Sequence, residues 1–290
     1  MNTPHRLSLT IVLAAFGLAA TTRLAAQADS AAPVFSENFE SGKLDPAVWD
    51  TRTNNGAVVK VQSDIVHGGK YALQVHYPAA AGAFGFIVAP HLPDSVRTHF
   101  FGRAYVYITP GMPAGHDPLL SAGGAGWPIS NFLELAASGG KNVMTSYQQN
   151  AANIDRNETI TNGKPYPVGK WFCLEWEFND QPDSINVWID GVASGELKNF
   201  VVKPRTTAPR RGAGGTPPAA GAAGTAPAPS PVAAATPPPA PKPTVKGDGL
   251  VKGFVDFAFG FRAWGKAPTA EYDLYYDDIA IGTQRIGPAK

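Results

Sequence analysis

The chain has 290 residues, one cysteine and a formal net charge of +1 at neutral pH. A single cysteine excludes an internal disulfide. The charge is uneven, because residues 204–246 carry five basic residues and no acid, whereas residues 29–203 and 247–290 together carry 17 Lys and Arg against 23 Asp and Glu. This acidic body lacks the basic footprint that nucleic-acid binding needs, so we expect no nucleic-acid partner.

The first residues predict export. His5 and Arg6 precede an apolar stretch from Leu7 to Ala20, and Ala26-Gln27-Ala28 has the form of a signal-peptide cleavage site. The apolar stretch, about 14 residues, is shorter than a helix that spans a bilayer. We therefore expect a signal peptide at 1–28 and a secreted or periplasmic protein with no membrane partner.

Residues 204–246 differ in composition from the rest of the chain. They contain 12 of the 27 prolines and no aromatic residue, and such a segment buries too little apolar surface to offset its ordering entropy. The 44 residues that follow are too few to form a core of their own. We therefore expect one domain, 29–203 plus 247–290, interrupted by a disordered Pro/Ala-rich insertion, and a monomer.

Alternation of aromatic or β-branched residues with polar ones predicts about ten strands and no helix. The predicted strands are Val58–Ser63, Tyr71–Tyr77, Phe84–Ala89, Phe100–Ile108, Asn131–Ala136, Asn142–Gln148, Trp171–Phe178, Ser184–Asp190, Phe254–Ala263 and Tyr272–Ile281. This pattern is typical of an all-β fold with two packed antiparallel sheets, a jelly-roll sandwich of the concanavalin-like type.

The alternation also assigns faces. In Trp171–Phe178 the even-numbered residues should face the core, with Cys173 buried or half-buried among the others. Outward positions of several strands then carry arginine, glutamate, tyrosine and tryptophan, which we expect to share one outer face. These residues are Arg103, Tyr105, Tyr107, Glu175, Glu177, Arg262 and Trp264.

Carboxylates beside aromatic residues mark both ends of the domain, in Phe35–Gly42 and in Glu271–Gly282. A sandwich often places its first and last strands side by side, so these carboxylates could surround one hard cation. Calcium takes six to eight oxygens, which carboxylates and backbone carbonyls supply. The candidates are Glu37, Glu40, Asp277 and Asp278, with carbonyls from the turn Asp64–Lys70.

The order of the sequence blocks resembles a known family. An acidic aromatic first strand is followed by His67-Gly-Gly-Lys70, Phe100–Tyr107, Gly115-His116, Gly169–Phe178 and Leu274–Gly287. This order is similar to the core domain of the fungal cellulose-induced protein family and its bacterial relatives, jelly rolls akin to glucuronan lyases and, more distantly, alginate lyases. The resemblance runs from about Phe35 to Gly287 and leaves out residues 204–246.

The resemblance implies a secreted protein that binds or acts on polysaccharide, with a structural calcium near the chain ends. Its metal ligands would be Glu40, His67, Lys70 and Asp277. The chain departs from the family pattern in its single cysteine and in the Pro/Ala insertion.

A polysaccharide lyase needs groups that neutralise the substrate carboxylate, abstract the C5 proton and protonate the leaving oxygen. Arg103 could bind the carboxylate through its fork of donors, helped by Gln149. His116 could be the base, because its ordinary pKa lies near neutrality, and it matches the family's Gly-His motif. Tyr147 could be the acid. The structural alternatives, without a role in catalysis, are a turn histidine for His116 and a packing residue for Tyr147.

Two further functions stay open. A non-catalytic carbohydrate-binding module needs only exposed aromatic residues such as Trp171, Trp188 and Trp264. A glycoside hydrolase needs paired carboxylates, and Glu175 and Glu177 lie two residues apart on one strand, without the spacing of the known hydrolase pattern. The residues predicted to contact substrate are Tyr105, Tyr107, Glu134, Glu175, Arg262 and Trp264.

Overall fold

The computed structural model describes residues 32–90, 92–112, 116–123, 131–138, 142–149, 154–159, 165–180, 183–198, 254–262 and 270–289. The predicted signal peptide and the predicted insertion at 204–246 lie outside these residues. Within the described ranges no helix is long and apolar enough to cross a membrane.

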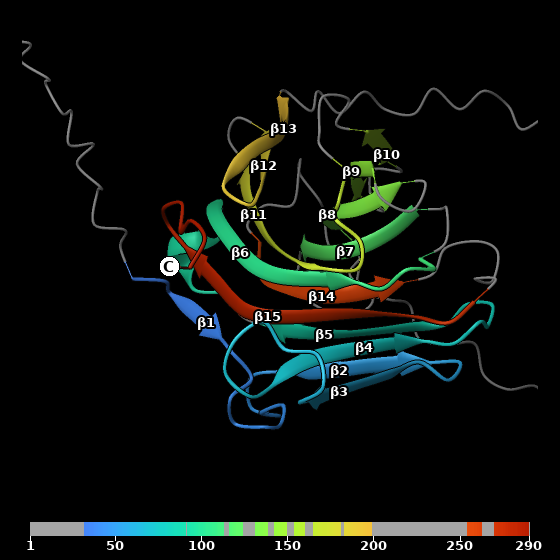
Figure 1. Cartoon of the computed structure of the whole chain (residues 1–290). Coiled ribbons are helices and arrows are strands. Elements are labelled where there is room, and N and C mark those ends of the chain that lie inside the picture. Colours follow the sequence, from blue (N-terminus) through green and yellow to red (C-terminus); the bar gives the residue numbers. More distant parts are fainter. Residues whose placement is uncertain are drawn as a thin grey trace, which may run out of the picture. The chain divides into compact units, whose positions relative to one another are not determined.

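The described strands form two antiparallel sheets (Figure 1). The 8-stranded sheet has the order β13-β12-β11-β6-β15-β4-β3, with β1 paired to β15. Its strands are β1 Phe35–Glu37, β3 Val58–Gln62, β4 Ala72–Tyr77, β6 His99–Ile108, β11 Trp171–Asp180, β12 Asp183–Ile189, β13 Val192–Lys198 and β15 Tyr272–Gly282.

The 7-stranded sheet has the order β10-β9-β8-β7-β14-β5-β2. Its strands are β2 Asp50–Asn54, β5 Phe84–Pro90, β7 His116–Gly123, β8 Asn131–Ser138, β9 Asn142–Gln149, β10 Ile154–Thr159 and β14 Asp256–Arg262. A short 3-10 turn, Asp94–Val96, is the one helical element of the described residues.

The jelly-roll prediction is confirmed, and all ten predicted strands are present to within two residues at each end. Strands β2, β7, β10 and β13 were missed, because their sequences are polar or carry proline or glycine and lack the apolar alternation. The predicted single outer face is wrong. Arg262 lies in β14 of the 7-stranded sheet, whereas Arg103 lies in β6 of the other sheet.

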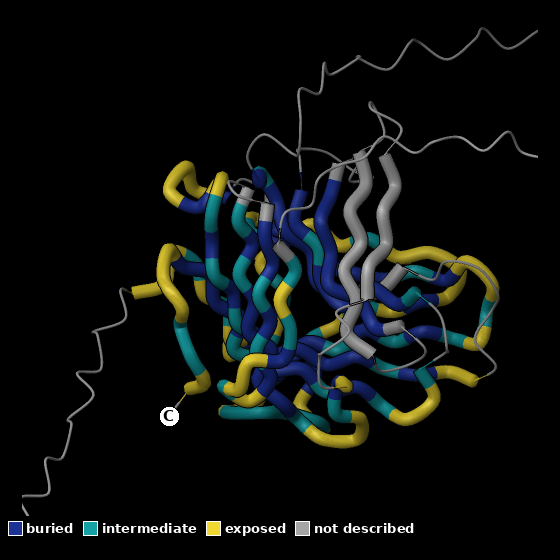
Figure 2. Tube along the Cα trace, turned by 90° about the horizontal axis from the view of Figure 1, so that it is seen from above, coloured by how far each residue is buried: buried dark blue, intermediate teal, exposed yellow. Residues whose placement is uncertain are grey.

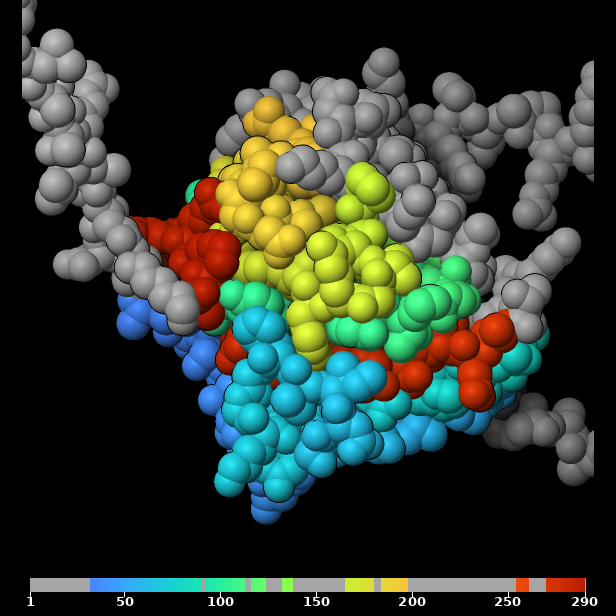
Figure 3. Space-filling model, viewed as in Figure 1, coloured from blue at the N-terminus to red at the C-terminus, as the bar shows by residue number. Residues whose placement is uncertain are grey.

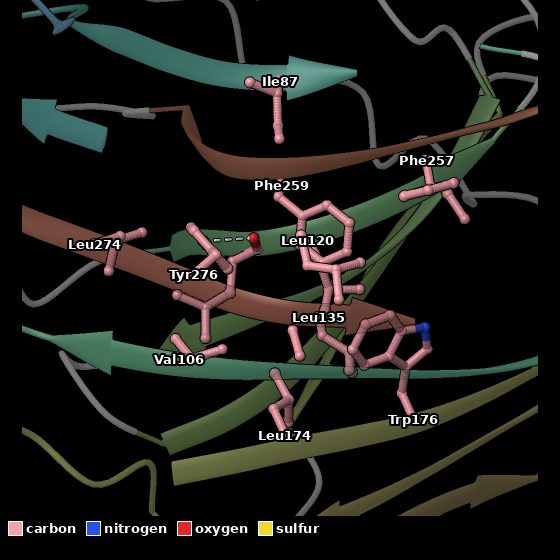
Figure 4. Packing of buried hydrophobic residues seen from close by; sticks show 14 of the residues in the cluster. Ile87, Val106, Leu120, Leu135, Leu174, Trp176, Phe257, Phe259, Leu274 and Tyr276 are labelled. Atoms are coloured by element: carbon pink, nitrogen blue, oxygen red, sulfur yellow. Dashed lines mark hydrogen bonds between the residues drawn. The ribbon is translucent and has the colours of Figure 1, made fainter. Parts of the chain in front are cut away.

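The inner faces of the two sheets share one hydrophobic core. Leu174 and Trp176 of β11 pack in the same cluster as Phe259 of β14 and Tyr276 of β15 (Figure 4). The buried parts of the chain run through the middle of the domain, while its turns are exposed (Figure 2). Each such large side chain contributes roughly 1.5–3 kcal/mol on burial.

The even-numbered residues of β11 face this core, as predicted, and Cys173 on the other face is also buried, at 2% exposure. Burial, together with the nearby Glu175 carboxylate, raises the pKa of Cys173 to about 12. A thiol that stays protonated is a poor nucleophile. The prediction of a buried structural cysteine is confirmed.

The first and last described strands lie side by side, as the sequence predicted. Strand β1 pairs with β15, so that Phe35 lies opposite Ile281 and Glu37 opposite Ile279. The pairing brings the two ends of the domain together beside the turn that joins β3 to β4.

Trp176 needs a glycine on the neighbouring strand. Gly102 of β6 is paired with Trp176, and a Cβ built on Gly102 would lie 2.1 Å from two atoms of the indole ring. No side chain fits there without moving a fully buried ring.

We expect Gly102→Ala to lower the free energy of unfolding by about 1–3 kcal/mol, the usual cost of overpacking a core. Gly282→Ala is the matched control, since its Cβ would meet nothing closer than 3.4 Å. Urea denaturation of the two variants measures the difference. Equal stabilities would show that the indole can move at little cost.

Candidate functional site

An acid–base pair lies where β7 and β8 run side by side in the 7-stranded sheet. Nε2 of His116, the first residue of β7, is 2.5 Å from Oε1 of Glu134 in β8. Glu134 is 4% exposed, whereas His116 is half-buried. The pairing of the two strands is irregular between Pro118 and Leu120, which lie between His116 and the part of β7 opposite Glu134.

This geometry suits a general base. A carboxylate bonded to one ring nitrogen fixes the orientation and the tautomer of the imidazole. When Nε2 carries the proton toward Glu134, the basic lone pair is on Nδ1. The carboxylate also stabilises the imidazolium that forms when His116 takes up a proton. His116 is the first residue of strand β7, which speaks against the alternative of a turn histidine.

An apolar patch adjoins this pair on the same sheet. Phe132 is two residues from Glu134 in β8, so the two side chains lie on one face. Phe132 belongs to a second hydrophobic cluster with Phe86, Val88 and Ala258. Phe84 packs against that cluster and stacks on Phe86 at 5.8 Å between ring centroids. The acid–base pair thus adjoins a buried apolar cluster that includes aromatic residues.

The other residues predicted for catalysis on this sheet are placed by their backbone only. Tyr147 pairs with Leu133 of β8, and Gln149 pairs with Asn131. This register puts Tyr147 and Gln149 on the face that carries the core residue Leu133, away from Glu134 and against their predicted roles beside His116. Their side chains lie outside the described part.

The prediction that Arg103 joins His116 at one site is wrong. Arg103 is in β6 of the 8-stranded sheet, on the other layer of the sandwich from β7. Its guanidinium donates to the carbonyl of Asp278 through Nε and Nη2, both at 3.3 Å, and to the carbonyl of Gly287 through Nη1 at 3.4 Å. Arg103 holds the C-terminal segment and is not available to a substrate carboxylate at His116.

Glu175 is also a structural residue, contrary to its predicted contact with substrate. It is 1% exposed, and Arg285 binds it through two bonds of 2.9 and 2.8 Å. The N–H of Gly287 adds a third bond of 3.0 Å. The guanidinium of Arg285 lies 4.4 Å above the ring of Trp188. Sequence reasoning missed Arg285, because nothing in a short polar tail predicts which buried acid it will meet.

Residues 283–289 thus form a C-terminal segment that covers part of the outer face of the 8-stranded sheet. Tyr105, another predicted contact, is 7% exposed and its hydroxyl accepts a bond from the N–H of Ala289 at 2.9 Å. Pro288 lies beside Gly191 at the turn between β12 and β13. Figure 3 shows this end of the chain, in red, against the yellow β12–β13 hairpin.

The carboxylate pair of a hydrolase is absent from β11. Glu175 is neutralised by Arg285, as above, and Glu177 bonds to His99 at 2.7 Å and to Asn186 at 2.6 Å. Both carboxylates are therefore engaged in structural bonds. This removes the argument for a glycoside hydrolase on this strand.

The remaining predicted contacts fall on different sheets. Arg262 pairs with Phe84 of β5, so its backbone belongs to the same sheet as His116. Its side chain and all of Trp264 lie outside the described residues. Tyr107 is half-buried on the outer face of the 8-stranded sheet, opposite Trp171 and Tyr275.

The predicted calcium ligands gather at the turn between β3 and β4, but their carboxylates meet peptide N–H groups. Oε1 of Glu40 accepts bonds from the N–H of Lys70 at 2.9 Å and of Tyr71 at 3.0 Å. Glu37, the alternative acid of this strand, bonds instead to the indole of Trp49 at 3.0 Å.

Asp277 is held in the same way. Its Oδ2 accepts bonds from the N–H of His67 at 3.1 Å and of Gly68 at 3.2 Å, and its Oδ1 accepts the N–H of Asp278 at 2.8 Å. Burial raises the pKa of Asp277 to about 6, although these N–H groups act to lower it. The carboxylate fastens the turn to the last strand.

The side chains at this turn offer calcium a small set of ligand atoms. Ligand atoms of His67, Asp277 and Asp278 lie within 4.8 Å of one another, and Nδ1 of His67 is 3.0 Å from Oδ2 of Asp278. Calcium prefers six to eight oxygens. This set offers one ring nitrogen and carboxylates that already accept N–H bonds. As they lie, these three side chains alone do not supply the oxygens that calcium takes, and the calcium site stays a prediction.

Comparison with known proteins defines the fold. No family model matches the chain, and no curated protein matches its sequence. Among solved structures, the cellulose-induced protein Cip1 has a TM-score of 0.55 at 15% identity, over 88% of this chain and 100% of that one. An endo-β-1,4-glucuronan lyase from the fungus Trichoderma reesei has a TM-score of 0.52 at 13% identity, over 87% of this chain and 96% of that one. The predicted resemblance is thus confirmed for the fold.

We expect Arg285→Met to lower the free energy of unfolding by about 2–3 kcal/mol, because it leaves the Glu175 carboxylate buried without its cation. Combining it with Glu175→Gln should restore at least half of the loss. Arg97→Met is the control, since Arg97 forms an exposed pair with Asp94 that contributes at most about 1 kcal/mol. Urea denaturation distinguishes them, and equal effects of Arg285→Met and Arg97→Met would contradict the buried role.

Removing divalent cations with EDTA should leave the thermal midpoint unchanged, within about 2 °C. A calcium site at a hundredfold excess over its Kd would stabilise the fold by about 2.7 kcal/mol, which in a domain of this size raises Tm by roughly 5–10 °C. Differential scanning calorimetry with EDTA and with millimolar calcium decides between them. A calcium-dependent rise that Asp277→Asn abolishes would restore the predicted calcium site.

Proposed function

We propose that this chain is an exported polysaccharide lyase that cleaves uronic-acid-containing glycans by β-elimination at the His116 face of the 7-stranded sheet. The observation that carries the proposal is the bond between His116 and the buried Glu134. The fold, which also occurs in an enzyme described as a glucuronan lyase, supports the substrate class. The N-terminal segment 1–28 supports export.

The proposed steps begin with His116 as the base. Nδ1 of His116 takes the proton from C5 of the uronate, and the electrons of the C5–H bond are held as the enolate of the adjacent carboxylate. These electrons form the C4–C5 double bond as the C4–O bond breaks, and the leaving oxygen takes up a proton from water. Glu134 stabilises the imidazolium of His116 throughout.

The carboxylate-binding group comes from a neighbouring strand in this proposal. Tyr147 and Gln149 of β9 are given no role, because their pairing with Leu133 and Asn131 puts them on the face of the sheet away from Glu134. Arg262 takes the role first given to Arg103, since β14 lies between β5 and β7 in the sheet that carries His116. A planar guanidinium suits a carboxylate, which it binds through two parallel bonds.

A second candidate is carbohydrate binding without chemistry. It is favoured by half-buried aromatic residues at outward positions of the 8-stranded sheet, Tyr107 and Trp171 among them. The two candidates place the glycan on opposite layers of the sandwich, so experiments can separate them.

Purified protein on glucuronan, alginate and pectate should give a rise in absorbance near 235 nm, where unsaturated uronic products absorb. We expect His116→Ala to reduce kcat by about 10²–10⁴-fold, the usual contribution of a general base. Glu134→Gln should cause a smaller loss, because it keeps a bond to the ring without the negative charge.

His99→Ala is the matched control. His99 forms a similar bond to a glutamate, Glu177, but on the other sheet, so this variant should keep its activity. If the unaltered protein gives no rise on any of the three polymers, it is not a lyase of this class. If His116→Ala is as active as the unaltered protein, another residue is the base.

A further inference from the structure

Five consecutive strands of the 8-stranded sheet carry one row of outward residues in direct register. Trp171 of β11 lies opposite Tyr107 of β6, which lies opposite Tyr275 of β15. Tyr275 lies opposite Gln74 of β4, and Gln74 lies opposite Lys60 of β3. These strands are neighbours across the sheet (Figure 1). At 4.8 Å between strands the row is about 20 Å long.

The aromatic members of this row form one cluster. The ring centroid of Tyr107 lies 5.8 Å from that of Trp171 and 5.8 Å from that of Tyr275, and the ring planes are steeply inclined to each other. Trp171 and Tyr275 are 6.5 Å apart. Trp171 and Tyr107 are half-buried, whereas Tyr275 is 6% exposed and packs beneath them.

Polar groups line the row beside Tyr275. Nε2 of Gln74 donates to Oδ1 of Asp273 at 2.8 Å and to the hydroxyl of Tyr275 at 3.3 Å. Nδ1 of His76 lies 3.0 Å from the same Asp273 oxygen. Asp273 and His76 keep 22% and 29% of their side chains exposed. A partly exposed carboxylate, amide and imidazole therefore adjoin an aromatic surface.

The row is distinct from the area under the C-terminal segment. The described bonds of that segment go to Glu175, Arg103, Tyr105 and the carbonyl of Gly191. Tyr105 is the next outward residue of β6 after Tyr107, so the segment reaches the border of the row.

The charge beside the row indicates the ligand. Asp273 and the exposed Glu271 lie on either side of His76. Burial raises the pKa of Tyr275 to about 12, and Asp273, then Tyr107, then Asp64 add to this effect. Carboxylates accept bonds from sugar hydroxyls but repel a polyuronate. Lys60, at the far end of the row, is the one Lys or Arg among its five described residues.

We propose that the row Trp171–Tyr107–Tyr275–Gln74 binds a neutral, linear polysaccharide on the face opposite to the His116 site. Trp171 and Tyr107 stack on the apolar faces of sugar rings. Gln74 and Asp273 bond to hydroxyl groups. This site does not depend on the lyase proposal, and each of the two can fail without the other.

Native affinity electrophoresis of the full chain tests this site. Gels would contain xyloglucan, mixed-linkage β-glucan or hydroxyethylcellulose, with alginate as the anionic contrast. We expect retardation by at least one neutral polymer and none by alginate. Trp171→Ala should weaken that binding by about tenfold or more, and Gln74→Ala by roughly threefold, the loss of one hydrogen bond.

Phe101→Ala is the matched control, because Phe101 is a half-buried outward aromatic residue of the same strand as Tyr107, six residues away. It should bind like the unaltered protein. His116→Ala should also bind normally, which separates this site from the catalytic one. Thermal unfolding of each variant checks the fold, and Gln74→Ala carries the test if Trp171→Ala is unfolded. Absence of retardation by all three neutral polymers, retardation that survives Trp171→Ala, or stronger retardation by alginate would overturn the proposal.

Discussion

The buried carboxylate of Asp277 needs hydrogen-bond donors, and the turn after β3 and the bulge in β15 provide them. Three peptide N–H groups meet it, two of them from the turn after β3. Strand β15 bulges there against β6, and Asp278 adopts a left-handed conformation with φ of 47°. The bulge presents the Asp278 carbonyl to Arg103. The ring of His67 stacks on that of Tyr105, with 3.4 Å between the ring centroids. One charge thus joins a turn, a strand and the C-terminal segment.

The sequence predicts the strands well wherever one face is buried, because period-2 alternation records burial directly. It therefore located β6, β11 and β15 and their core residues. It does not record the order of strands in a sheet, which depends on contacts between distant segments. Arg103 and His116 were therefore grouped, although their strands lie in different layers. Strand β2, with its polar sequence Asp-Thr-Arg-Thr-Asn, carries no alternation and was missed.

The candidate site shows the same division. His116 and Glu134 were each singled out by residue type, but their contact follows from the pairing of β7 with β8 and from its irregularity near Pro118. The concealment of Glu175 could not be predicted, because it depends on where Arg285 settles after the last strand. Residue types therefore identified His116 and Glu134 on the 7-stranded sheet. On the 8-stranded sheet they gave Glu175 a contact with substrate, although the C-terminal segment covers it.

The order of strands has a consequence for how the chain reaches this fold. Strand β15 is inserted between β6 and β4, and β14 between β7 and β5. Both strands lie after residue 254, so each sheet is divided into two halves until these strands have arrived. Such non-local pairing makes folding slow, and it leaves the facing edges of β4, β6, β5 and β7 open for strand addition in the meantime. The domain therefore completes both sheets only after β14 and β15 have been made, and a chain truncated before β14 would expose four edges at once.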